Sequence, residues 1–134
     1  MAGKVDWYAN DVLIKVGGAT DDVLNSLALW VEGEAKVHMN VDTGFMRNAT
    51  YTILVGGAEG TTSAGSGSYT NRAGRSVQRN RVAMPAVPEG AAAVHSAAEY
   101  AIFQELLNPC LYPALEKARK VAKGIIEQIG KERL

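Results

Sequence analysis

The last quarter of the chain carries the pattern that most restricts the possible folds. Apolar residues recur there at steps of three and four, namely Leu115, Ala118, Ala122, Ile125 and Ile129. This spacing places them on one face of an α-helix, and mainly lysine, arginine and glutamate fill the other positions. Pro113 stands near the first turn, where its missing N–H does no harm. The segment is therefore predicted to be a helix of about five turns that buries one face.

A second amphipathic helix is predicted over residues 20–38. Thr20 suits the N-cap position, and Asp21 and Asp22 place negative charge in the first turn, where the helix dipole favours it. The apolar stripe of this helix is made by Leu24, Leu27, Ala28, Val31 and Ala35. The chain thus supplies two amphipathic helices, one near each end.

The remaining periodic segments favour short strands. Residues 49–55 alternate and are rich in β-branched and aromatic side chains, which predicts a strand. Residues 91–96 predict another strand, small and apolar, that leads into a short helix over 99–107. Residues 5–16 are compatible with a short strand or a helical turn, and Gly17-Gly18 are expected to end either one.

Residues 56–76 are dominated by glycine, serine and threonine and cannot bury enough apolar surface to order themselves alone. We expect residues 56–84 to be a flexible loop or the tip of an extended hairpin, with 77–84 as the returning strand. The 134 residues suggest a single domain, 1–134, and 47% apolar and 21% charged residues are ordinary for a globular protein. The predicted class is α+β, with a small antiparallel sheet and a Gly/Arg-rich hairpin loop, packed against an N-terminal helix and a long C-terminal helix.

Chemistry-bearing motifs are scarce. The single cysteine, Cys110, stands in no motif, and the two histidines, His38 and His95, lie far apart, so no metal-ligand spacing occurs. No Walker loop, dinucleotide fingerprint or nucleophile elbow is present. A hydrolase could use Asp42, Glu99 or Glu105, but solvated or capping carboxylates are the stronger interpretation. We therefore expect no enzyme and no cofactor.

Arginines are concentrated in the flexible segment. Arg72, Arg75, Arg79 and Arg81 fall within ten residues, and no acidic residue occurs between Glu59 and Glu89. Such a loop could contact phosphates or an acidic protein surface, with Tyr69 stacking on a base or filling a pocket. The plainer interpretation is a loop that is charged for solubility. The balance of fourteen basic and fourteen acidic residues argues against a dedicated DNA-wrapping protein.

Asp42, Thr43 and Gly44 predict a turn between the first helix and the sheet, because short polar side chains bond nearby backbone amides. Arg47 follows the turn and is available for a contact with another subunit. Asp-Thr-Gly also occurs in retroviral-type aspartic proteases, but there a hydrophobic strand precedes it. Here a predicted helix precedes it, so the protease interpretation is disfavoured.

Several stretches together resemble one family of bacteriophage proteins. Residues 41–48 (VDTGFMRN) resemble the signature P-V-D-T-G-x-L-R-x-S, and residues 94–105 are similar to a Y-A-x-x-x-E segment that follows a strand. Residues 111–116 (LYPALE) resemble P-F-L-x-P-A-L-E before a long terminal helix, and residues 14–18 resemble the usual opening strand and glycine. The family is described as tail-component, tail-completion or neck protein of long-tailed phages.

The resemblance implies a structural protein of the virion that forms a ring at the head–tail junction and leaves a channel for DNA. Its expected partners are further copies of the chain, a portal-side connector, tail-tube or tail-terminator proteins and the DNA that passes through. Assembly in the host bacterial cytoplasm follows, with no membrane and no small-molecule substrate. The alternative that the residues leave open is a nucleic-acid-binding module built on the basic loop 72–81.

Overall fold

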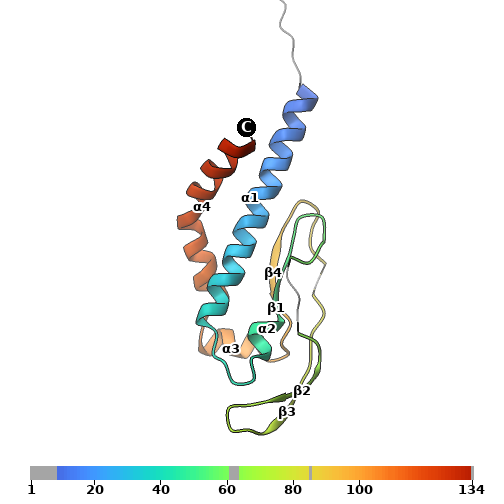
Figure 1. Cartoon of the computed structure of the whole chain (residues 1–134), viewed down its shortest axis with the longest axis vertical. Helices are drawn as coiled ribbons and strands as arrows, with labels where there is room; N and C mark the ends of the chain where they lie inside the picture. Colours follow the sequence, from blue (N-terminus) through green and yellow to red (C-terminus); the bar gives the residue numbers. More distant parts are fainter. Residues whose placement is uncertain (1–8, 61–63, 85, 134) are drawn as a thin grey trace, which may run out of the picture.

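The computed structural model describes residues 9–60, 64–84 and 86–133, with side chains from residue 15 to residue 132 apart from those gaps. Two long helices, α1 (Ala9–His38) and α4 (Leu111–Arg133), run antiparallel and pack along each other (Figure 1). A sheet of two strands lies against the other side of α1, and a second, separate pair of strands lies at the end of the molecule away from the chain's C-terminus. The α+β class predicted from the sequence is confirmed.

The first sheet joins β1 (Thr50–Ile53) to β4 (Ala93–Ser96) in antiparallel register, with Thr50 opposite Ser96 and Ile53 opposite Ala93. All four residues of β1 are buried, although two of them are threonines. Thr50 Oγ1 donates to the carbonyl of Met46 at 2.8 Å, and Thr52 Oγ1 donates to Glu32 at 3.3 Å. Buried hydroxyls are tolerated here because each has a partner.

The second pair of strands forms a hairpin from β2 (Gly67–Thr70) and β3 (Ser76–Arg79). The sequence suggested that residues 77–84 return alongside the strand 49–55. Instead β3 pairs with β2 inside the glycine-rich segment, and β1 takes β4 as its partner. A local hairpin needs only a short loop to close, whereas β1 gains a half-buried partner of mostly small side chains in β4.

The prediction for the N-terminal helix was wrong about its start. Helix α1 continues without a break from Ala9 through Gly17-Gly18, and Thr20 lies inside it, with Oγ1 donating to the carbonyl of Val16 at 2.8 Å. Each glycine costs about 1 kcal/mol relative to alanine in a helix. Extending a helix already nucleated by its packed turns costs far less than starting one, so the glycine pair does not end it.

Two short helices complete the fold. Helix α2 (Phe45–Ala49) occupies part of the segment that the sequence assigned to a turn and the start of a strand, and it buries Phe45 and Met46. Helix α3 (Ala101–Leu107) confirms the predicted short helix, and the terminal helix α4 begins four residues after it ends. The core lies between α1, α2, β1 and the first half of α4, with Phe45, Ala35 and Ala49 fully buried.

Candidate functional site

The Asp42-Thr43-Gly44 segment forms the turn into α2. Gly44 has φ +77°, a left-handed conformation that disfavours any side chain, and its carbonyl accepts from the backbone N–H of Asn48 at 3.0 Å. Thr43 Oγ1 accepts from the backbone N–H of Phe45 at 3.1 Å. The three residues thus set the direction in which the chain leaves α1.

Asp42 ties this turn to the arginine hairpin. Its carboxylate accepts a hydrogen bond from the backbone N–H of Arg72 at 2.9 Å and lies 3.5 Å from a guanidinium nitrogen of Arg79. The Arg79 guanidinium also stacks 4.8 Å from the ring centre of Tyr100. The Arg79 side chain, expected to contact a partner, is therefore engaged with the rest of this chain, whereas Arg72 is held only through its backbone.

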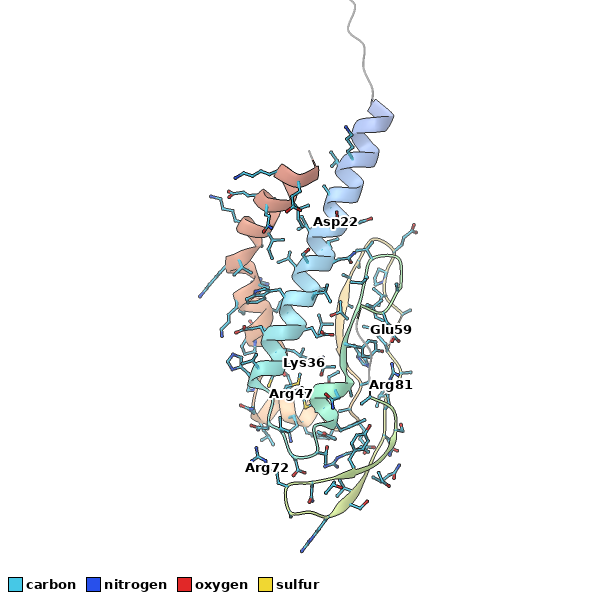
Figure 2. The ribbon with its side chains drawn as sticks, viewed as in Figure 1. Asp22, Lys36, Arg47, Glu59, Arg72 and Arg81 are labelled. Carbon is cyan, nitrogen blue, oxygen red and sulfur yellow. The ribbon has the colours of Figure 1, made fainter. Side chains whose placement is uncertain are left out.

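Tyr69 and Arg81 are likewise occupied within the chain. The Tyr69 ring packs on Phe45 with ring centres 4.9 Å apart, and its hydroxyl donates to the carbonyl of Gly65 at 2.6 Å. The Arg81 guanidinium lies 5.0 Å from the ring centre of Tyr51 and 3.6 Å from the Glu59 carboxylate (Figure 2), and Tyr51 and Glu59 together raise its pKa. Tyr69 thus helps to anchor the hairpin, which leaves its ring little freedom to stack on a base.

The exposed basic groups are fewer than the sequence suggested. Arg72 and Arg75 are exposed in the loop that joins β2 to β3, and among the described residues no carboxylate pairs with either guanidinium. Arg72 lies at the end of the molecule far from the chain's C-terminus (Figure 2). Arg47 is half-buried on α2, and its Nε has no hydrogen-bond partner within the described part of the chain.

The carboxylates considered for catalysis all have structural partners. Asp42 holds the hairpin, and Glu99 accepts from the Asn80 side-chain amide at 3.0 Å. Glu105 accepts from the backbone N–H groups of Cys110, Leu111 and Tyr112 at 2.9–3.1 Å, which caps the start of α4. Burial favours the neutral form of Glu105, but these three donors outweigh it and lower its pKa. Because each of the three carboxylates has a structural partner, no two of them form a catalytic pair.

The cysteine and the histidines also lack a catalytic arrangement. Burial, with the nearby charge of Glu105, raises the pKa of the Cys110 thiol, which makes it a poor nucleophile at neutral pH. His38 contacts Glu34 and Lys117, and His95 Nε2 lies 3.3 Å from the carbonyl oxygen of Val82. In the part of the chain that the structure describes, no group of three metal-binding side chains comes together.

The most unusual surface lies on α3, and the sequence reasoning did not consider it. None of its seven residues is buried, yet it carries four large apolar side chains that are 64–83% exposed, namely Ile102, Phe103, Leu106 and Leu107. These positions are spaced i, i+1, i+4 and i+5, which makes one continuous ridge on the helix. We call it the α3 ridge. The seven-residue run AIFQELL carried this signal, but only the structure shows that the ridge faces solvent.

A second apolar surface is concave and lies elsewhere on the molecule. A groove of about 480 Å³ opens between α1, β4 and α4, with Leu24 and Leu27 on one wall and Leu115 and Ala122 on the other. Val94 of β4 also lines it. We call it the α1–α4 groove. Exposed apolar surfaces of this extent are typical of binding sites on small proteins.

No protein-family model, curated protein or solved structure matches this chain, so the resemblance to the phage family stays a prediction. Among the helices of the described residues, none is both long and apolar enough to cross a membrane. The site is therefore defined by its surfaces: an apolar ridge, an apolar groove and a hairpin with two exposed arginines.

Proposed function

We propose that this chain is a structural protein that assembles with copies of itself into a ring, in the neck of a long-tailed bacteriophage virion. The observation that carries the proposal is the presence of two separate apolar surfaces, the α3 ridge and the α1–α4 groove, on one small chain. Clusters of exposed apolar side chains on a small protein often mark sites that a partner covers. The sequence motifs around residues 41–48 and 111–116 supply the phage assignment.

The energy of such a contact suits a closed assembly. Covering four side chains of this size, already partly shielded, yields on the order of 4–8 kcal/mol. Bringing two proteins together costs about 4–15 kcal/mol before any contact is counted. A single contact of this kind is therefore weak. Closing a ring adds one further interface without the association cost of bringing in another subunit.

The hairpin supplies the contact expected of a neck protein with its surroundings. Arg72 and Arg75 extend from the β2–β3 loop, where they can meet DNA in a central channel or an acidic surface of a connector or tail protein. Asp42 binds the backbone of the hairpin and the Tyr69 ring packs on Phe45, so these two charges are presented in a defined position. Assembly in the host cytoplasm before incorporation into the virion is part of the same proposal.

The basic-loop alternative rests on the same two arginines. Arg79 and Arg81 already pair with Asp42 and Glu59, which leaves about two charges for phosphates. Neutralising two phosphates gives a salt dependence with a log–log slope of roughly −2, far shallower than that of a dedicated DNA-binding protein. The structure's geometry therefore supports an assembly protein better than a nucleic-acid-binding module.

The test is the mass of the purified protein in solution by light scattering, followed by negative-stain imaging, with and without phage connector and tail-tube proteins. Rings, or monomers that become rings with those proteins, are the expected result. The variant Phe103→Ser/Leu107→Ser should remove the assembly, whereas Val82→Ser, which changes an exposed apolar residue outside both surfaces, should leave it intact. A monomer that ignores every virion protein, yet binds DNA, would contradict the proposal.

A further inference from the structure

The α1–α4 groove is built to receive apolar side chains. Its lining comes from two helices and a strand, and nearly all of the lining residues are apolar, among them Leu27, Val31, Val94 and Leu115. An empty apolar cavity of about 150 Å³ in another protein holds one benzene molecule. At about 480 Å³, this groove has room for roughly three side chains of leucine or phenylalanine size.

The α3 ridge has the complementary form. Ile102 and Leu106 are one turn apart, as are Phe103 and Leu107, and all four are more than 60% exposed. Helices that dock in apolar grooves present anchors at this spacing. Three such anchors would fill the groove, and the fourth would cover its rim.

The ridge and the groove do not meet within one chain. The four ridge residues are absent from the groove lining, although Leu111 and Tyr112, which follow α3 closely, form one end of it. The hydrogen bonds from Cys110, Leu111 and Tyr112 to the Glu105 carboxylate fix α3 to the start of α4. The short connection cannot fold α3 back into the groove while these bonds hold, so the ridge can enter a groove only on another copy of the chain.

Charge also favours a second copy of α3 as the occupant. Glu105 is the single charged residue of the helix, and its carboxylate is already turned to the backbone of α4. At the groove, Arg119 is paired with Glu116 at 3.3 Å and is well exposed. Docking α3 therefore buries no unpaired charge. Most foreign amphipathic helices carry acidic or basic residues beside their anchors and would bury such a charge.

We propose that the α3 ridge of one subunit inserts into the α1–α4 groove of the next, so that the same head-to-tail contact repeats from subunit to subunit. When each subunit inserts its ridge into one neighbour and receives the ridge of another, the contact is heterologous and generates a ring or an open chain, whereas reciprocal insertion between two copies would give a closed twofold dimer. A ridge-to-ridge dimer is the competing arrangement, and it would leave the apolar groove in water. The inference rests on the proposed function, since it names the interface that closes the ring.

Site-specific disulfide formation in the full chain tests the contact. The background variant is Cys110→Ser, which replaces the native thiol and keeps a donor for the carbonyl of His38. Into it are introduced Leu106→Cys on the ridge and Ala122→Cys in the groove, together in one chain. Mild oxidation should produce a ladder of disulfide-linked oligomers on a non-reducing gel, and mass spectrometry should identify the 106–122 linkage between chains.

Matched variants separate the alternatives. With Lys123→Cys in place of Ala122→Cys, the cysteine moves one residue along α4 to a side chain that is 88% exposed, and no ladder should form. Leu106→Cys alone should stay monomeric on the gel. Efficient 106–106 dimers would instead show ridge-to-ridge packing and overturn the inference.

Solution measurements complete the test without relying on oxidation. Leu106→Ser should weaken self-association about tenfold or more, and Ala122→Trp, which fills the groove, should do the same. Circular dichroism checks that each variant keeps its helical content, and Phe103→Ser replaces any variant that does not fold. If the wild type forms rings, the rings persist in Ala122→Trp, and the Leu106→Cys/Ala122→Cys variant gives no 106–122 linkage, this interface alone is overturned. A wild-type chain that stays monomeric at its highest soluble concentration and with every virion protein would overturn the proposed function itself.

Discussion

The carboxylate of Asp42 accepts a hydrogen bond from the backbone N–H of Arg72 at 2.9 Å, across thirty residues of sequence. The same carboxylate lies 3.5 Å from the Arg79 guanidinium, so one side chain holds both ends of the β2–β3 hairpin against the turn that follows α1. The residues that resemble a phage signature and the arginine-rich segment thus form one unit. The contacts of Asp42 therefore help to set where Arg72 and Arg75 are presented.

Replacing Asp42 should loosen the hairpin, and two substitutions separate the contribution of its charge from that of its hydrogen-bond acceptor. Asp42→Asn keeps an acceptor for the Arg72 N–H but loses the charge, and it should lower the free energy of unfolding by roughly 0.5 kcal/mol. Asp42→Ala loses both and should cost about 1–2 kcal/mol. Hydrogen exchange at the Arg72 amide should accelerate clearly in the alanine variant and little in the asparagine variant. Arg75→Gln, in the same loop without a contact to Asp42, is the control, and equal acceleration there would contradict the account.

Two glycines should respond to alanine in opposite directions. Gly44 has φ +77°, so Gly44→Ala places a side chain in the left-handed region and should destabilise the fold by about 1–2 kcal/mol. Gly33 lies within α1, and a methyl group there meets no described atom within 4 Å beyond the neighbouring backbone of the helix itself. Gly33→Ala should therefore stabilise the protein by about 0.5–1 kcal/mol. Urea unfolding followed by circular dichroism measures both, and a loss of stability in Gly33→Ala would show that α1 is not a regular helix at that point.

Glu105 should make stability depend on acidic pH. Three backbone donors hold its pKa below the ordinary value of 4.5 despite partial burial, so its contribution is complete above pH 4.5 and is lost as the pH falls through the folded pKa. Glu105→Gln should cost about 1–2 kcal/mol at neutral pH. The difference between wild type and variant should shrink as unfolding is repeated at decreasing pH. A difference that stays constant down to pH 3 would show that the carboxylate charge is not what caps α4.

A second carboxylate reports on the packing of α1 against α4. Lys117 of α4 donates to Glu34 of α1 at 2.8 Å, and His38 lies 3.2 Å from the same oxygen. The hydrogen bond from Lys117, followed by that from His38, lowers the pKa of Glu34. In Lys117→Met this pKa should rise toward 4.5, as measured by carbon-13 NMR of the side-chain carboxyl. Lys123→Met, further along α4, should leave it unchanged; a shift in both variants would mean that general charge, not this contact, sets the value.

The sequence by itself determined the elements with a strong local signal. The three- and four-residue spacing from Leu115 to Ile129 predicted α4, alternation around Tyr51 predicted β1, and the small apolar run around Val94 predicted β4. Gly17-Gly18 were predicted to end the preceding element, but α1 runs through them. Each glycine costs the helix about 1 kcal/mol, and the favourable propagation of a helix that is already formed outweighs this cost. The pattern from Phe45 to Ala49 gave no sign of α2, since five residues are too few for a period to show.

Only the tertiary structure decided which of these elements meet and which faces remain open. The pairing of β1 with β4, the hold of Asp42 on the hairpin and the engagement of Arg79 and Arg81 all join residues that are distant in sequence. The spacing of Ile102 and Leu106 shows that α3 has an apolar side, but not that this side faces water. Local periodicity fixes which side chains share a face of an element, whereas burial depends on the elements packed against it. The α3 ridge and the α1–α4 groove, on which assembly is proposed to depend, therefore became visible only in the folded chain.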